Sequence, residues 1–161
     1  MEDTRIHKQT EIHAPVSRVW QALTDIQQFG QWFRVRLREP FVPGQISSGP
    51  LTWPGYEDRQ MSVITQKIEP ERYFSFTWHP YAIDPHVDYS QETPTLVEFT
   101  LEATASGTLL SVTESGFENV PPHRRHEAFL RNTSGWAQQL DNINTYVINA
   151  HAGSVHVQQT S

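Results

Sequence analysis

The sequence of 161 residues is within the usual size of one domain and is long enough to bury a core. Its formal net charge of −6 argues against a protein that binds phosphate backbones or anionic lipid surfaces. It contains no cysteine, which excludes disulfides, thiol catalysis and cysteine-bound metal and suits a reducing compartment. No signal peptide or stretch of membrane-spanning length is found, so we expect a cytoplasmic protein without membrane insertion.

The N-terminal part of the sequence predicts one strand followed by two short helices. Residues 5–12 alternate between two faces, as a half-buried strand does. Ala14-Pro15 then opens a helix, because proline is tolerated in a first helical turn. Asp25 can cap a second short helix. The apolar residues of these two helices recur at helical spacing: Val16, Val19, Trp20 and Leu23, then Ile26, Phe29, Trp32 and Phe33.

The middle of the sequence predicts strands joined by turns. Alternating, β-branched and aromatic residues place them at 34–38, 46–53, 61–68, 73–78, 95–104 and 108–115. Residues 79–94 contain three prolines and three acidic residues, and we expect them to form a loop. Because that loop is long and stiffened by proline, it can serve as a lid over the mouth of a pocket.

Pro121-Pro122 introduces the longest predicted helix. Its inward residues step by alternating fours and threes, the spacing of one helix face. They are Phe129, Thr133, Trp136, Leu140, Ile143, Val147 and Ala150. Residues 151–161 are polar and without pattern, so we expect one domain at 1–150 followed by a flexible tail at 151–161.

This order of elements predicts an α+β architecture. A sheet of about six or seven strands has to cover its apolar face, and the only long amphipathic element is the C-terminal helix. We therefore expect a curved antiparallel sheet wrapped around that helix, with the two short helices closing one end. Large aromatic side chains at the facing positions can hold the walls of a cavity apart.

Several segments resemble, in order, one branch of the START-like (Bet v 1-like, SRPBCC) superfamily, the branch of the activator of Hsp90 ATPase homologue. They are Ala14-Pro15-Val16, Val19–Thr24, Trp32-Phe33, Ile68–Arg72, Phe76-Thr77-Trp78, Val97–Leu101, Val112–Phe117, and Gly135-Trp136 followed by Leu140. The resemblance implies the helix-grip fold and a pocket for a hydrophobic ligand between the sheet and the long helix. Members of the superfamily range from lipid and hormone binders to cyclases and hydrolases, so the fold does not settle the function.

Glu114 is the sharpest single candidate for a site residue. Strand parity places it on the face of Leu110 and Val112, which is expected to face the helix. A partly desolvated carboxylate there can orient a polar group of a ligand or act as an acid or base. Alternatively, Glu114 reaches solvent at the end of its strand or caps backbone amides near Gly116.

The other candidate ligand-binding residues are large side chains that can line a pocket, although simple core packing is the alternative role for each and the favoured one for most. They are Trp32, Phe33, Trp53, Phe76, Trp78, Phe99, Phe117, Trp136 and Leu140.

No cofactor or metal is predicted. His79, Asp84, His86 and Asp88 lie in or beside one loop, but nothing in their spacing brings three ligands together. The alternating arginines at 34, 36 and 38 are typical of a solvated strand face, so we expect no nucleic-acid binding. Neither a nucleophile elbow nor a glycine-rich phosphate motif is found, and we identify no catalytic residue.

The leading interpretation is a carrier or sensor that binds a small hydrophobic or amphipathic ligand in an internal cavity. One alternative is an enzyme of the same fold that cyclises, dehydrates or hydrolyses a ring-bearing metabolite, which a second titratable group facing Glu114 would favour. Another is a co-chaperone-like interaction module, which an exposed apolar patch would favour. An exposed sheet edge also makes a homodimer possible.

Overall fold

The structure, a computed structural model, describes residues 4–82, 84 and 86–160, with residues 150–160 described as backbone only. Within these residues, six antiparallel strands form one sheet in the order β1-β6-β5-β4-β3-β2. Their bounds are β1 Arg5–Ile12, β2 Ile46–Pro50, β3 Gln60–Glu69, β4 Tyr73–Trp78, β5 Thr95–Ala103 and β6 Thr108–Ser115. The strands at the two edges of the sheet are therefore β1 and β2.

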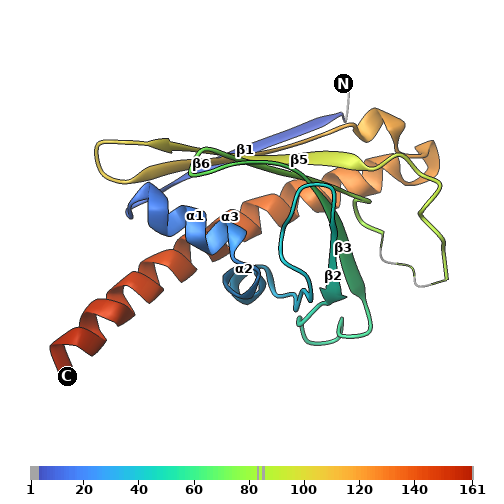
Figure 1. The fold of residues 1–161 in the computed structure, drawn as a ribbon. Helices are drawn as coiled ribbons and strands as arrows, with labels where there is room; N and C mark the ends of the chain where they lie inside the picture. The colour runs from blue at the N-terminus through green and yellow to red at the C-terminus, as the bar shows by residue number, and fades with distance from the viewer. Residues whose placement is uncertain (1–3, 83, 85, 161) are drawn as a thin grey trace.

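The helices lie on one face of this sheet (Figure 1). Their bounds are α1 Val16–Thr24, α2 Ile26–Phe33 and α3 Pro122–Thr160, with a 3-10 turn, η1, at Phe117–Asn119. The long helix α3 runs obliquely beneath the sheet, and β2 and β3 curve down beside it (Figure 1). This arrangement confirms the predicted α+β fold, in which a curved antiparallel sheet surrounds a long C-terminal helix.

Local sequence signals account for the elements that position the site. On β6 every second residue is buried, and Leu110, Val112 and Glu114 all point to the helix side as strand parity predicts. Asp25 caps α2, since its carboxylate accepts hydrogen bonds from the backbone N–H groups of Gln27 and Gln28. The predicted inner face of α3 is buried at Trp136, Leu140, Ile143 and Val147.

Residues 34–38 differ from the prediction of a strand. Only Val35 forms a β-bridge, to Leu51, although the N–H groups of Arg36 and Arg38 donate to the carbonyls of Pro50 and Ser48. The segment leaves α2 through a left-handed Arg34, at φ 71°, and runs beside β2 without a regular ladder. At the other end of the chain, α3 continues to Thr160. The flexibility of 151–161 stays a prediction.

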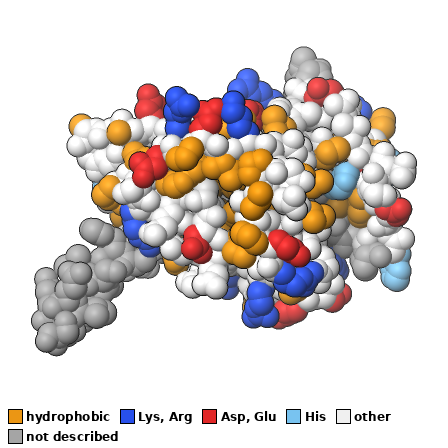
Figure 2. Space-filling view, viewed as in Figure 1, with side chains coloured by type: hydrophobic (Ala, Val, Ile, Leu, Met, Phe, Trp, Pro, Cys, Tyr) orange, Lys and Arg blue, Asp and Glu red, His pale blue; other side chains and the backbone are white. Residues whose placement is uncertain are grey.

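The space between the sheet and α3 is filled largely by aromatic rings. Five phenylalanines are almost completely buried there: Phe29, Phe74, Phe76, Phe99 and Phe117. The outward face of the sheet is charged instead, with basic and acidic groups interspersed along its edge (Figure 2). Glu69 on β3, for example, accepts from both Lys67 and Arg72. Among the described residues, none of the helices is long and apolar enough to cross a membrane.

Candidate functional site

Glu114 is a fully buried carboxylate surrounded by hydrogen-bond donors. One carboxylate oxygen accepts from the indole N–H of Trp136 and the side-chain amide of Asn132. The other accepts from the indole N–H of Trp78 and the hydroxyl of Thr95. The four distances lie between 2.5 and 2.9 Å. An indole N–H can only donate a hydrogen bond. Each carboxylate oxygen therefore has one partner, Trp78 or Trp136, that requires an acceptor at this position.

The sheet register explains why these groups meet. Trp78 at the end of β4 pairs with Thr95 at the start of β5, and Val97 pairs with Glu114 on β6. Trp78, Thr95 and Glu114 therefore lie at one end of the sheet and face the helix. Asn132 and Trp136, one helical turn apart on α3, complete the cluster from the opposite side.

A small pocket of about 90 Å³ lies directly beside this cluster. The rings of Phe33, Trp78 and Trp136, called here the aromatic triad, are in mutual contact, with centroid separations of 5.6 to 6.2 Å. Together with Asn132, Gly135 and Gln139 of α3, the aromatic triad lines the pocket. The pocket is therefore mostly apolar, with two amide side chains at its rim.

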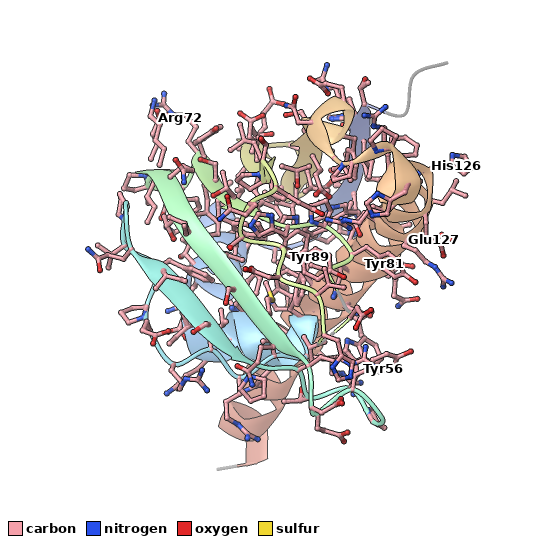
Figure 3. All side chains as sticks on the ribbon, turned by 90° about the vertical axis from the view of Figure 1, so that its right-hand side faces the viewer. Tyr56, Arg72, Tyr81, Tyr89, His126 and Glu127 are labelled. Carbon is pink, nitrogen blue, oxygen red and sulfur yellow. The ribbon has the colours of Figure 1, made fainter. Side chains whose placement is uncertain are left out.

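A second pocket of about 290 Å³ adjoins the first, since Phe33 and Trp78 line both pockets. Its remaining walls come from the edge of the sheet and from the loop between β4 and β5: Leu51, Gln60, Met61, Ser62, His79, Ala82 and Tyr89. Tyr81 and Tyr89 lie on this loop, which crosses the open side between the sheet and α3 (Figure 3).

The β4–β5 loop is fastened to the first turns of α3 by Arg124. Its guanidinium forms an ion pair with Glu92, and the two side chains are only 12% and 15% exposed. The same guanidinium donates to the backbone carbonyl of Pro80 and lies 4.8 Å from the ring centroid of Tyr89. The loop that the sequence predicts as a lid is thus held at both of its ends by one side chain; its role as a lid stays a prediction.

His79, at the start of this loop, has a lowered pKa. Burial lowers the pKa of His79 below its usual 6.5, with Arg124 adding to the decrease and Glu92 opposing it. Because the unfolded chain takes up a proton here that the folded protein does not, stability falls as the pH drops below about 6.5 towards the lower pKa of the folded state.

We therefore expect wild-type protein to lose more stability between about pH 7 and pH 5 than a His79→Phe variant, as measured by urea denaturation. The other titrating groups are common to both proteins, so their contributions largely cancel in the comparison. Parallel stability profiles for the two proteins would contradict the expectation.

The sequence-predicted site residues separate into three groups. Phe33, Trp78, Trp136 and Glu114 come together at the pocket. Trp53 is half-buried and lies apart from them, with the Arg34 guanidinium 4.8 Å from its ring centroid. The remaining predicted residues are packed in the core: Trp32, Phe76, Phe99, Phe117 and Leu140.

Other residues of the site are not among the sequence predictions. Asn132 and Thr95 donate to Glu114, Gly135 and Gln139 line the first pocket, and His79 lines the second. The helical spacing of Asn132, Gly135, Trp136 and Gln139 is the one sequence signal that groups several of them. Among the side chains that the structure describes, no group of three or more His, Asp or Glu residues is placed to hold a metal.

The fold and the site define a helix-grip domain with an aromatic pocket between its sheet and its long helix. The chain belongs to the family of Activator of Hsp90 ATPase homolog 1-like proteins, whose family model matches residues 13–147. This match confirms the family resemblance that the sequence motifs indicate. A comparison with curated proteins gave no match.

Solved structures of similar fold include three that cover most of this chain. MLL2253 from Mesorhizobium loti is 23% identical, with 90% of this chain and 97% of that chain covered and a TM-score of 0.71. NE0264 from Nitrosomonas europaea is 18% identical, with coverages of 92% and 96% and a TM-score of 0.72. DynU16, from the dynemicin biosynthetic locus, is 22% identical over 92% of this chain but only 49% of its own, with a TM-score of 0.70. The present chain thus spans about half of DynU16, and these likenesses concern the fold.

Proposed function

We propose that the protein binds a small hydrophobic or amphipathic ligand at the aromatic triad, between the sheet and α3. The observation that carries this proposal is the pocket itself, which has three large rings on its walls and a buried carboxylate behind two of them. Ring walls supply apolar contact area, and the amides of Asn132 and Gln139 can fix the orientation of a polar group.

Glu114 has a positioning role in this proposal. Both of its oxygens are occupied by protein donors, so it acts on a ligand through the side chains that it holds. Three of those side chains, Trp78, Asn132 and Trp136, line the pocket. The carboxylate fixes the orientation of two indole rings and one amide, and therefore the shape of the binding surface.

The ligand occupies both pockets. The first, at about 90 Å³, accommodates only a small group, whereas pockets for small molecules commonly measure about 300–1,000 Å³. The second, at about 290 Å³, is separated from it by Phe33 and Trp78. A rotation of these two side chains joins the pockets and brings the combined space to the lower end of that range.

Gly135 offers a direct test, because a Cβ built there meets no atom within 4 Å. A glycine inside a helix lowers helix stability by about 1 kcal/mol relative to alanine. At this position, the absence of a side chain keeps the pocket open in return for that loss. We expect Gly135→Leu to fill the pocket and to weaken binding of 1-anilinonaphthalene-8-sulfonate at least about tenfold. The readout is energy transfer from tryptophan to the bound dye.

Ser134→Leu is the matched control, since it adds the same side chain at a neighbouring exposed position. It should leave dye binding unchanged. Circular dichroism of both variants checks that the helix is retained. Equal dye affinity in wild-type and Gly135→Leu protein would count against the pocket as the binding site.

The remaining expectations about partners and location stay predictions. A cytoplasmic location and the absence of nucleic-acid binding rest on composition alone. A homodimer is suggested by the two edge strands, β1 and β2, because an unpaired edge can pair with a second copy.

A further inference from the structure

The second pocket contains a polar atom that the protein leaves unused. Nδ1 of His79 is buried, and it has no hydrogen-bond partner among the described residues. An unpaired buried polar atom costs about 1–3 kcal/mol, so its persistence calls for an explanation in function. His79 also lines the pocket beneath the β4–β5 loop, and a rotation of its ring that turns Nδ1 towards the pocket lets a ligand there supply the missing partner.

The surroundings of His79 define the chemistry of that partner. Burial lowers the pKa of His79, which favours a neutral imidazole with one donor and one acceptor nitrogen. A hydroxyl group both donates and accepts, so it satisfies Nδ1 in either tautomer. The two charges that act on His79, Arg124 and Glu92, form an ion pair with each other, so the local charges are balanced and a neutral ligand group is favoured.

The rest of the pocket suits the ring that carries this hydroxyl. Phe33 and Trp78 separate the two pockets and can contact a planar ring from either one. Leu51, Met61 and Ala82 add apolar surface on the sheet and loop sides. The polar atoms of Gln60 and Ser62 belong to the same wall.

We propose that the second pocket is a subsite for the hydroxyl end of a ring-bearing ligand, whose hydroxyl forms a hydrogen bond with Nδ1 of His79 while the ring lies against Phe33 and Trp78. This inference rests on the proposed ligand-binding function, which it extends from a hydrophobic ligand in general to a hydroxylated ring compound. His79 is thereby a residue that determines ligand specificity.

Two probes that differ by one hydroxyl group test the subsite: naphthalene and 2-naphthol. Affinities are measured by ligand-observed NMR titration for wild-type, His79→Phe and, as a control, His7→Phe protein. His7 lies on the outer face of β1, where its ring bonds to Thr113 far from the pocket. We expect wild-type and His7→Phe protein to bind 2-naphthol about tenfold more tightly than naphthalene, the value of one net hydrogen bond.

In His79→Phe the preference should disappear, through weaker binding of 2-naphthol and unchanged binding of naphthalene. A full preference in His79→Phe would overturn the subsite and leave the ligand-binding function standing. If wild-type protein bound neither these probes nor the anilinonaphthalene dye, the proposed function would fail together with the subsite. A second measurement needs no variant: the ¹⁵N resonance of His79 Nδ1 should shift on addition of 2-naphthol to wild-type protein and stay in place with naphthalene.

Discussion

Replacement of Glu114 by glutamine is expected to destabilise the protein by about 2–4 kcal/mol, because a side-chain NH₂ group, which donates, replaces a carboxylate oxygen that accepts hydrogen bonds. The two indole N–H groups bond to different oxygens of the carboxylate, so the amide nitrogen of Glu114→Gln has to face one of them. One indole then loses its acceptor inside the core, and the new amide N–H group can donate only to the hydroxyl of Thr95 or to a flipped side-chain amide of Asn132. Urea denaturation of the variant measures the loss of free energy of unfolding.

Glu102→Gln is the control for this substitution. Glu102 lies on the outer face of β5 and is exposed, so the same chemical change there should alter stability by less than about 0.5 kcal/mol. If Glu114→Gln were as mild as Glu102→Gln, the hydrogen-bond cluster would not hold the two tryptophans in place. Its role in shaping the pocket would then be wrong.

Arg124→Met is the second substitution with a large expected effect, about 3–5 kcal/mol of lost stability. It leaves the carboxylate of Glu92, which is only 15% exposed, without its cation. It also removes the hydrogen bond to the Pro80 carbonyl and the contact with Tyr89. The rate of backbone hydrogen exchange should therefore rise most in the β4–β5 loop and less in the sheet.

The ion pair of Arg131 with Glu127 on the same helix provides the comparison. Its side chains are 62% and 53% exposed, and solvent screens the attraction between them. The Arg131 guanidinium also lies 5.4 Å from the ring centroid of Tyr81 on the β4–β5 loop, a contact worth about 0.5–1 kcal/mol at an exposed site. Arg131→Met should therefore reduce stability by no more than about 1 kcal/mol. Equal losses in Arg124→Met and Arg131→Met would mean that the loop is not fastened by the Arg124–Glu92 pair.

Much of the fold follows from periodicity in the sequence. Alternation on β6 predicts that Glu114 faces the helix, and the steps of four and three on α3 predict the buried face that contains Trp136 and Leu140. These patterns are local, and each is enforced by the burial of one face. The segment at 34–38 alternates as well, yet it forms only one bridge, because a left-handed residue and a neighbouring loop interrupt the ladder.

The composition of the site could not be predicted in the same way. The four donors to Glu114 come from β4, β5 and α3, and no spacing in the sequence relates Trp78 or Thr95 to Asn132. Whether an aromatic residue lines a pocket or fills the core also depends on packing between distant elements. Phe76 and Phe33 illustrate the difference, since the first is buried among other rings and the second lines both pockets.

Native mass spectrometry of the protein purified from its own cells tests the central claim most directly. Wild-type protein should retain a small molecule that is released on denaturation, and Gly135→Leu, whose new side chain occupies the pocket, should retain none. Wild-type protein without any bound molecule, or the same bound molecule in both proteins, would contradict a ligand site at the aromatic triad.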